Sequence, residues 1–247
     1  LGVDAPSVAF TLTEVEQLTR RIGDALIVVM NADGAVGVSA DTGRAQMGLQ
    51  KIADVPPQFA EWLGDRSFQA DYGCRFAYVT GAMANGIASV DLVVAAAEAG
   101  LVGFFGAAGL GYERIEAAIG ELHSRLVSPD GPRTNWGVNL IHAPNEPQLE
   151  WRTALLLAQT SVPAVEISAF TQLTKGVAYL SAKGLSQTAD GRIVRARRLM
   201  TKVSRPELAE RFFSPIPDAL LQALRDEGLI SASEFELARR IAAVDDL

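Results

Sequence analysis

Residues 76–110 read FAYVTGAMANGIASVDLVVAAAEAGLVGFFGAAGL, and this stretch decides the fold. An apolar strand enters a small-residue turn at Gly81–Gly86, a helix follows, and a second apolar strand enters another such turn at Gly106–Gly109. Parallel strands place turns of this kind at their common carboxyl edge, where open sheets and barrels bind ligands. Backbone without side chains lets a flat or phosphorylated ligand approach closely. The stretch therefore predicts a cofactor site.

The alternation of strands and helices continues downstream of this stretch. We expect parallel strands at residues 76–80, 101–105, 136–141 and 164–168, with a fifth within 193–204. Such alternation predicts an α/β fold with a parallel sheet, either a barrel or a doubly wound sheet. The first turn lacks the G-x-G-x-x-G pattern, and no acidic residue ends the second strand as a dinucleotide fold requires. A (β/α)8 TIM-type barrel is therefore favoured.

The expected barrel is incomplete. Residues 1–75 differ in sequence pattern from the repeating strands and helices that follow. We expect them to form a small N-terminal appendage with a β-hairpin around Asn31–Gly34. Residues 76–247 hold about five βα units and end in a helical segment at 206–241, whereas a closed barrel needs eight units over ~250 residues. The barrel is therefore expected to stop before it closes, in either a fragment of a longer chain or a naturally short protein.

Composition excludes several classes of protein. The net charge of −7 and pI near 5.0 argue against a nucleic-acid-binding protein. No apolar run has the ~18 residues that a membrane helix needs, and no secretory signal is found. Two histidines and a single cysteine, Cys74, lack the spacing of a metal site, and we expect that thiol to be buried or idle. A cytoplasmic location is expected.

Four positions carry polar or sulfur chemistry at the expected strand ends. The Met83 thioether could pack on a planar ring, although Gly81–Gly86 could equally be a tight turn alone. Asn139 is either a satisfied core amide or a contact to a bound heterocycle. His142 is a candidate pocket residue or a loop-packing ring. Lys202 could pair with an anionic ring edge or a phosphate.

A cationic run extends from Arg192 to Arg205 and includes Arg195 and Arg198. It is either the solvated face of a strand or a docking patch for an acidic partner.

Several motifs, taken in order, resemble one family. They are GAMANGIAS (81–89), LVGFFGAAGL (101–110), WGVNLIHAPNEP (136–147), ISAF (167–170), TKVSRPELAERFFSPIP (201–217) and GLISASEFELA (228–238). The chain is similar to the trans-acting FMN-dependent enoyl reductases of polyketide and polyunsaturated fatty-acid synthases. Those enzymes are members of the nitronate monooxygenase-like (2-nitropropane dioxygenase-like) FMN barrels.

The resemblance implies a flavin enzyme that acts on carrier-bound substrates. FMN would take a hydride from NADPH or NADH and reduce the α,β-double bond of an enoyl thioester on an acyl carrier protein. By position, Gly81, Ala82, Met83 and Ala84 would line the flavin, and Asn139 and Lys202 would contact it.

Further expectations depend on the same resemblance. Arg195 and Arg198 would help to dock the acyl carrier protein. The presumed catalytic histidine of the family is expected beyond Leu247, in a strand that this chain does not contain. A nitronate monooxygenase-like flavoenzyme and a non-catalytic half-barrel interaction module are alternatives, and pairing with another chain, including a homo-oligomer, is left open.

Overall fold

The computed structural model describes residues 7–41, 48–129 and 131–246. These residues form two compact units, divided between Leu63 and Gly64. Helix α2 (Arg66–Tyr72), which lies within the expected appendage, is thus part of the larger unit, because Tyr72 is buried against its sheet. Among the described residues, no helix is both long and apolar enough to cross a lipid bilayer.

The N-terminal unit contains an antiparallel sheet in the order β1-β3-β2-β4. Its elements are β1 (Val8–Ala9), α1 (Leu12–Thr19), β2 (Leu26–Met30), β3 (Val36–Ser39), β4 (Gln50–Val55) and the short 3-10 helix η1 (Ala60–Trp62). The predicted hairpin is confirmed: β2 pairs with β3, and the Asn31 side chain accepts hydrogen bonds from the Asp33 and Ala35 amides within the turn.

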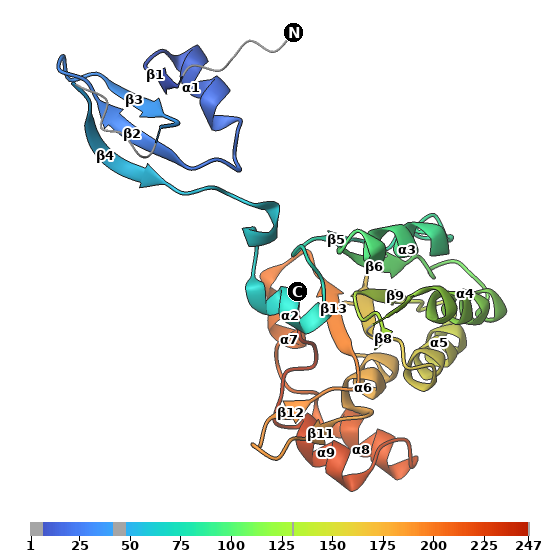
Figure 1. Ribbon diagram of the computed structural model, residues 1–247. Coiled ribbons are helices and arrows are strands. Elements are labelled where there is room, and N and C mark those ends of the chain that lie inside the picture. The colour runs from blue at the N-terminus through green and yellow to red at the C-terminus, as the bar shows by residue number, and fades with distance from the viewer. Residues whose placement is uncertain (1–6, 42–47, 130, 247) are drawn as a thin grey trace. The chain divides into compact units, whose positions relative to one another are not determined.

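The C-terminal unit is built on a five-stranded parallel sheet in the order β13-β10-β9-β6-β5 (Figure 1). Its strands are β5 (Val79–Thr80), β6 (Val102–Phe105), β9 (Trp136–Ile141), β10 (Ala164–Ser168) and β13 (Arg198–Lys202). Each strand neighbours the next one in sequence, as in a TIM barrel, so the sheet is a half-barrel of the α/β class. The predicted fold class is confirmed.

Helices connect the strands and cover one face of this sheet (Figure 1). The helices of the unit after α2 are α3 (Val90–Glu98), α4 (Tyr112–Arg125), α5 (Pro147–Gln159), α6 (Lys175–Ala182), α7 (Pro206–Phe212), α8 (Asp218–Asp226) and α9 (Ala232–Ala238). Two short antiparallel pairs join β7 (Val127–Ser128) to β8 (Gly131–Pro132) and β11 (Ser186–Gln187) to β12 (Ile193–Val194). A capping box formed by Ser231 and Glu234 begins α9.

The sheet has two chemically different faces. Side chains such as Val138, Val165 and Leu199 pack against the helices. Alternate positions point to the opposite face, called here the inner face, where Phe104, Ala164 and Met200 form a smaller cluster with Tyr72 and Cys74 of the α2 region. Cys74 is buried as expected, and burial raises the pKa of its thiol. The inner face is thus apolar near the amino ends of the strands.

Candidate functional site: the mouth of the half-barrel

The mouth of the half-barrel is the edge formed by the carboxyl ends of β5, β6, β9, β10 and β13. The first glycine loop, Gly81–Gly86, leaves β5, and the second, Gly106–Gly109, leaves β6. The two loops are bonded together: the Asn85 N–H donates to Ala108 O at 2.7 Å, and the Gly86 N–H donates to Gly106 O at 2.9 Å.

Contact between the loops explains the glycines of the second one. A Cβ atom at Gly106 would lie 1.6 Å from Met83 O, and one at Gly109 would lie 2.2 Å from Asn85 Oδ1. The absence of side chains there is required by the neighbouring loop, whether or not a ligand is present. In the first loop, by contrast, Gly81, Met83 and Ala84 are exposed, so this backbone is open to a ligand.

Asn139 holds the second loop in place. Its side chain is buried in β9, and Oδ1 accepts hydrogen bonds from Ala107 N at 2.7 Å and Ala108 N at 3.2 Å. The side-chain oxygen of Asn139 is therefore satisfied within the core, as the first of the two interpretations expected. Contact between Asn139 and a bound heterocycle stays a prediction. A small cavity of about 50 Å³ lies beside Asn139 and the second loop, large enough for water and not for a flavin.

Glu166 holds the first loop and Lys202 together. This carboxylate in β10 is 1% exposed; Oε1 lies 3.0 Å from Lys202 Nζ, and Oε2 accepts a hydrogen bond from Ala82 N at 3.3 Å. A Cβ atom at Gly81 would lie 3.7 Å from Glu166 Oε1 and 3.8 Å from Lys202 Nζ, so all three positions meet at one point. The Lys202 side chain is 53% exposed there.

Glu166 is not among the residues that the sequence pattern singled out. The signal was present, because a carboxylate inside the apolar strand AVEIS has to find a partner when it is buried.

His142 lies at the end of β9, on the side of the mouth that α5 covers. Its Nδ1 is 3.0 Å from Glu150 Oε2, and its ring centroid is 5.0 Å from that of Phe170. Glu150 also accepts from the Ala143 N–H at 3.0 Å and from the Thr174 hydroxyl at 2.8 Å. The ring is therefore fixed by the loops after β9 and β10, as in the loop-packing alternative; its role as a pocket residue stays a prediction.

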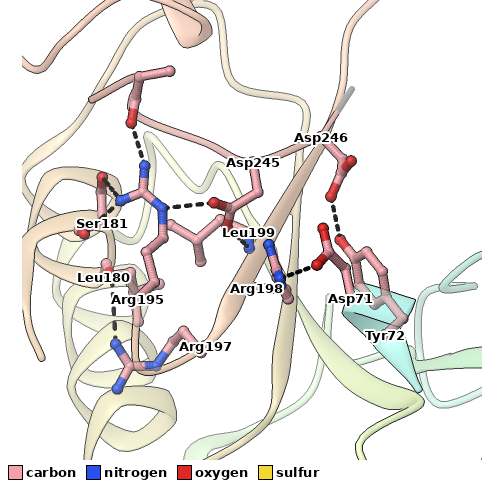
Figure 2. A network of polar contacts seen from close by, with 11 residues as sticks. Asp71, Tyr72, Leu180, Ser181, Arg195, Arg197, Arg198, Leu199, Asp245 and Asp246 are labelled. Carbon is pink, nitrogen blue, oxygen red and sulfur yellow. Dashed lines mark hydrogen bonds and ion pairs between the residues drawn. The ribbon is translucent and has the colours of Figure 1, made fainter. Parts of the chain in front are cut away.

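Within the cationic run, Arg195 is the correction to the docking expectation, because it is buried. Its side chain is 7% exposed; Nε pairs with Asp245 at 2.9 Å, and the other nitrogens donate to Ser181 and to Ala242 O (Figure 2). Burial lowers the pKa of the Arg195 guanidinium, and Asp245 acts in the opposite direction. A buried and fully paired guanidinium is not available to a docking partner.

Its neighbours are also committed to the chain. Arg197 is buried; its Nη1 and Nη2 groups donate to Leu180 O (Figure 2), Lys183 O and Ala158 O, near the ends of α5 and α6. Its Nε has no hydrogen-bond partner among the described residues. Arg198 is more exposed and pairs with Asp71 on α2. Because Arg198 begins β13 and Lys202 ends it, Arg198 lies at the opposite edge of the sheet from the mouth.

The mouth combines open backbone with polar side chains from β10 and β13. An open backbone, a half-exposed ammonium group and a buried hydroxyl without a partner, on Ser168, lie together at one edge. Among the described residues, no group of three His, Cys, Asp or Glu side chains could hold a metal ion. The fold is a half-barrel of the TIM-barrel type, and its mouth is the candidate site.

The chain is similar to proteins of polyunsaturated fatty-acid and polyketide biosynthesis. It is 44% identical over 185 residues to a subunit of the polyunsaturated fatty acid synthase of Thraustochytrium sp. and 39% identical over 188 residues to the polyketide biosynthesis protein PksE of Bacillus subtilis. These matches cover 75% and 76% of this chain. The enoyl reductase domain of MlnA from Bacillus amyloliquefaciens superposes with a TM-score of 0.70 and 34% identity over 74% of this chain.

The predicted resemblance to proteins of polyketide and polyunsaturated fatty-acid synthases is therefore confirmed. The chain spans 12% and 24% of the lengths of the two curated relatives and 41% of the MlnA chain. No family model matches the sequence.

Proposed function

We propose that this chain forms part of an FMN-dependent enoyl reductase that reduces carrier-bound enoyl thioesters in polyketide or polyunsaturated fatty-acid biosynthesis. The observation that carries the proposal is the likeness to the MlnA enoyl reductase domain, at 34% identity and a TM-score of 0.70. The relatives from two kinds of synthase support the same biosynthetic setting.

The residues at the mouth fit a flavin. Gly81, Ala82, Met83 and Ala84 would receive the ring on exposed backbone, and Lys202 would place a positive charge at its edge. A bound flavin supplies hydride transfer from reduced nicotinamide to the β-carbon of the thioester. The chain's own contribution is to place the ring and to supply the electrostatic environment: Asn139 and Glu166 fix the two loops, and Glu166 directs the Lys202 ammonium group toward Gly81.

The test uses the intact protein that carries this chain. We expect a yellow protein with a flavin absorption spectrum, and oxidation of NADPH or NADH under anaerobic conditions when an enoyl thioester on an acyl carrier protein is added. Oxidation that requires oxygen and a nitroalkane would instead support a nitronate monooxygenase. A colourless protein that binds carrier protein without turnover would support a non-catalytic module.

Of the two arginines predicted to dock the acyl carrier protein, only Arg198 remains a candidate. Arg198 remains partly exposed, so Arg198→Glu is expected to weaken carrier-protein binding, with a loss that shrinks as salt is added. Asp71→Asn, which removes only the partner of Arg198 within the chain, is the matched control and should not weaken binding. Equal affinities of wild type and Arg198→Glu, measured by calorimetry at low salt, would move the docking surface elsewhere.

A further inference from the structure

Ser168 carries a hydroxyl that the fold leaves without a partner. The residue ends β10 and is 8% exposed, and its Oγ makes no hydrogen bond within the described part of the protein. A buried hydroxyl normally finds a donor or an acceptor, because leaving it unpaired forfeits its hydrogen bonds with water. An unpaired one at the mouth of a half-barrel points to a ligand as its partner.

Strand register places this hydroxyl beside Lys202. Ser168 lies directly opposite Lys202 across the β10–β13 pair, and two residues beyond Glu166 on the same strand. Side chains two apart on a strand, and those opposite each other on neighbouring strands, project from the same face of a sheet. The hydroxyl and the ammonium group therefore belong to the inner face at the mouth.

Glu166 fixes the orientation of Lys202 without using all of its donors. Its Oε1 lies 3.0 Å from Nζ, and a lysine ammonium has three N–H groups. At 53% exposure, the Lys202 side chain keeps donors on its open side. The charged donor is thus held next to Gly81, and the neutral one lies beside it across the β10–β13 pair.

We propose that Ser168 and Lys202 form a notch that binds a carbonyl-type oxygen bearing negative charge, with Glu166 as the positioning residue. The inference rests on the proposed function and adds Ser168 and Glu166 to it. Two oxygens in that reaction have this chemistry: the ring carbonyl oxygen of the flavin, and the thioester oxygen of the substrate. Both accept hydrogen bonds from a hydroxyl and an ammonium group, and charge-assisted bonds of this kind are the stronger ones.

The test is Ser168→Ala in the intact protein, with Thr201→Val as its matched control. Thr201 is also a buried hydroxyl residue at this edge, but its Oγ1 already donates to Ile167 O at 3.0 Å. For Ser168→Ala we expect an unchanged or higher melting temperature without ligand, and binding about tenfold weaker. For Thr201→Val we expect a lower melting temperature and unchanged binding.

Two measurements assign the oxygen. A tenfold rise in the dissociation constant for FMN, titrated by fluorescence without substrate, assigns the notch to the flavin. An unchanged FMN affinity with a tenfold loss in kcat/KM for the enoyl thioester assigns it to the substrate. Glu166→Gln, which keeps an acceptor for Ala82 N but releases Lys202, should reproduce the same loss.

Two further outcomes would overturn the inference, and they are distinguishable. If wild type binds FMN and reduces the thioester, and Ser168→Ala does both equally well, the hydroxyl has no ligand role and the notch is wrong. If wild type neither binds FMN nor reduces the thioester, the proposed function fails and the notch fails with it.

Discussion

The two edges of the parallel sheet differ in how their polar side chains near Arg195 and near Lys202 are bonded within the chain. At the amino edge, Arg195 is bonded to Asp245, Ser181 and Ala242, and Asp245 also accepts from the Leu199 N–H (Figure 2). At the carboxyl edge, Lys202 is half exposed, and the Ser168 hydroxyl has no partner among the described residues. Saturated polar networks rigidify a fold, whereas unsatisfied groups are kept where something else binds. We therefore expect the Arg195 network to stabilise the unit, and the carboxyl edge remains the proposed ligand site.

The largest effect is expected from Asp245→Ala. The change leaves the Arg195 guanidinium buried without its carboxylate and the Leu199 N–H without an acceptor, so unfolding free energy should fall by about 3–5 kcal/mol in urea titrations. Asp190→Ala is the control, because Asp190 and Arg192 form an ion pair with 60% and 77% of their side chains exposed, and we expect a much smaller loss of stability there. Equal losses in the two variants would contradict the contrast between a buried and an exposed pair.

A double variant tests whether the unpaired charge of Arg195 causes this loss of stability. Replacing both partners, as in Arg195→Met with Asp245→Leu, removes the unpaired charge, so part of the stability lost in Asp245→Ala should return. A double variant no more stable than Asp245→Ala would mean that the Leu199 N–H, and not the charge, dominates the loss.

The second effect tests the carboxyl edge. Asn139→Ala removes the acceptor of the Ala107 and Ala108 N–H groups, so we expect a loss of about 2 kcal/mol and faster hydrogen exchange in the second glycine loop. Asn135→Ala is the matched control: its amide donates to Ala97 O and Leu101 O near the amino edge, so it should destabilise without opening the loop. Loop exchange that rises equally in both variants would refute a local role for Asn139.

Sequence alone predicted the central strands and failed where tertiary contacts decide. The expected strands 136–141 and 164–168 match β9 and β10, because both are mostly apolar runs, interrupted by Asn139 and Glu166, between two neighbouring strands. The first strand is shorter than expected, since the Arg75 and Phe76 N–H groups bond to Gly100 O in place of a strand. Helix α6 was missed because nearly all its residues are buried, which removes the polar side of the helical pattern.

The loops of the candidate site were predictable from the sequence, whereas the burial and pairing of its charged side chains were not. The two glycine loops and Lys202 stand at the mouth as the strand–turn pattern indicated. Arg195 was misread because a run of cations is typical of a surface, and its partner Asp245 lies 50 residues further along the chain. Such long-range pairing has no local signature, so the burial of Arg195 emerges only when the strands are assembled.

The smallest expected effect is a pH dependence of the unfolding free energy that comes from Asp246. Burial raises the pKa of Asp246, whose Oδ2 accepts from the Tyr72 hydroxyl at 2.8 Å, so the folded state holds this proton more tightly than the unfolded chain. Stability from this group is therefore present below its ordinary pKa of about 3.9 and is lost as pH rises through the higher folded value. Asp246→Asn should remove that part of the pH dependence in urea titrations between about pH 3 and 7.

Tyr72→Phe tests the direction of the coupling between these two residues. The Tyr72 hydrogen bond lowers the pKa of Asp246 and so opposes the effect of burial. Burial raises the pKa of Tyr72 itself, which keeps its hydroxyl protonated as the donor. Without that donor, the Asp246 pKa should rise further, and the loss of stability should move to higher pH than in wild type. The pH dependence of stability would belong to another carboxylate if Tyr72→Phe moved it to lower pH. The same would hold if Asp246→Asn left it unchanged.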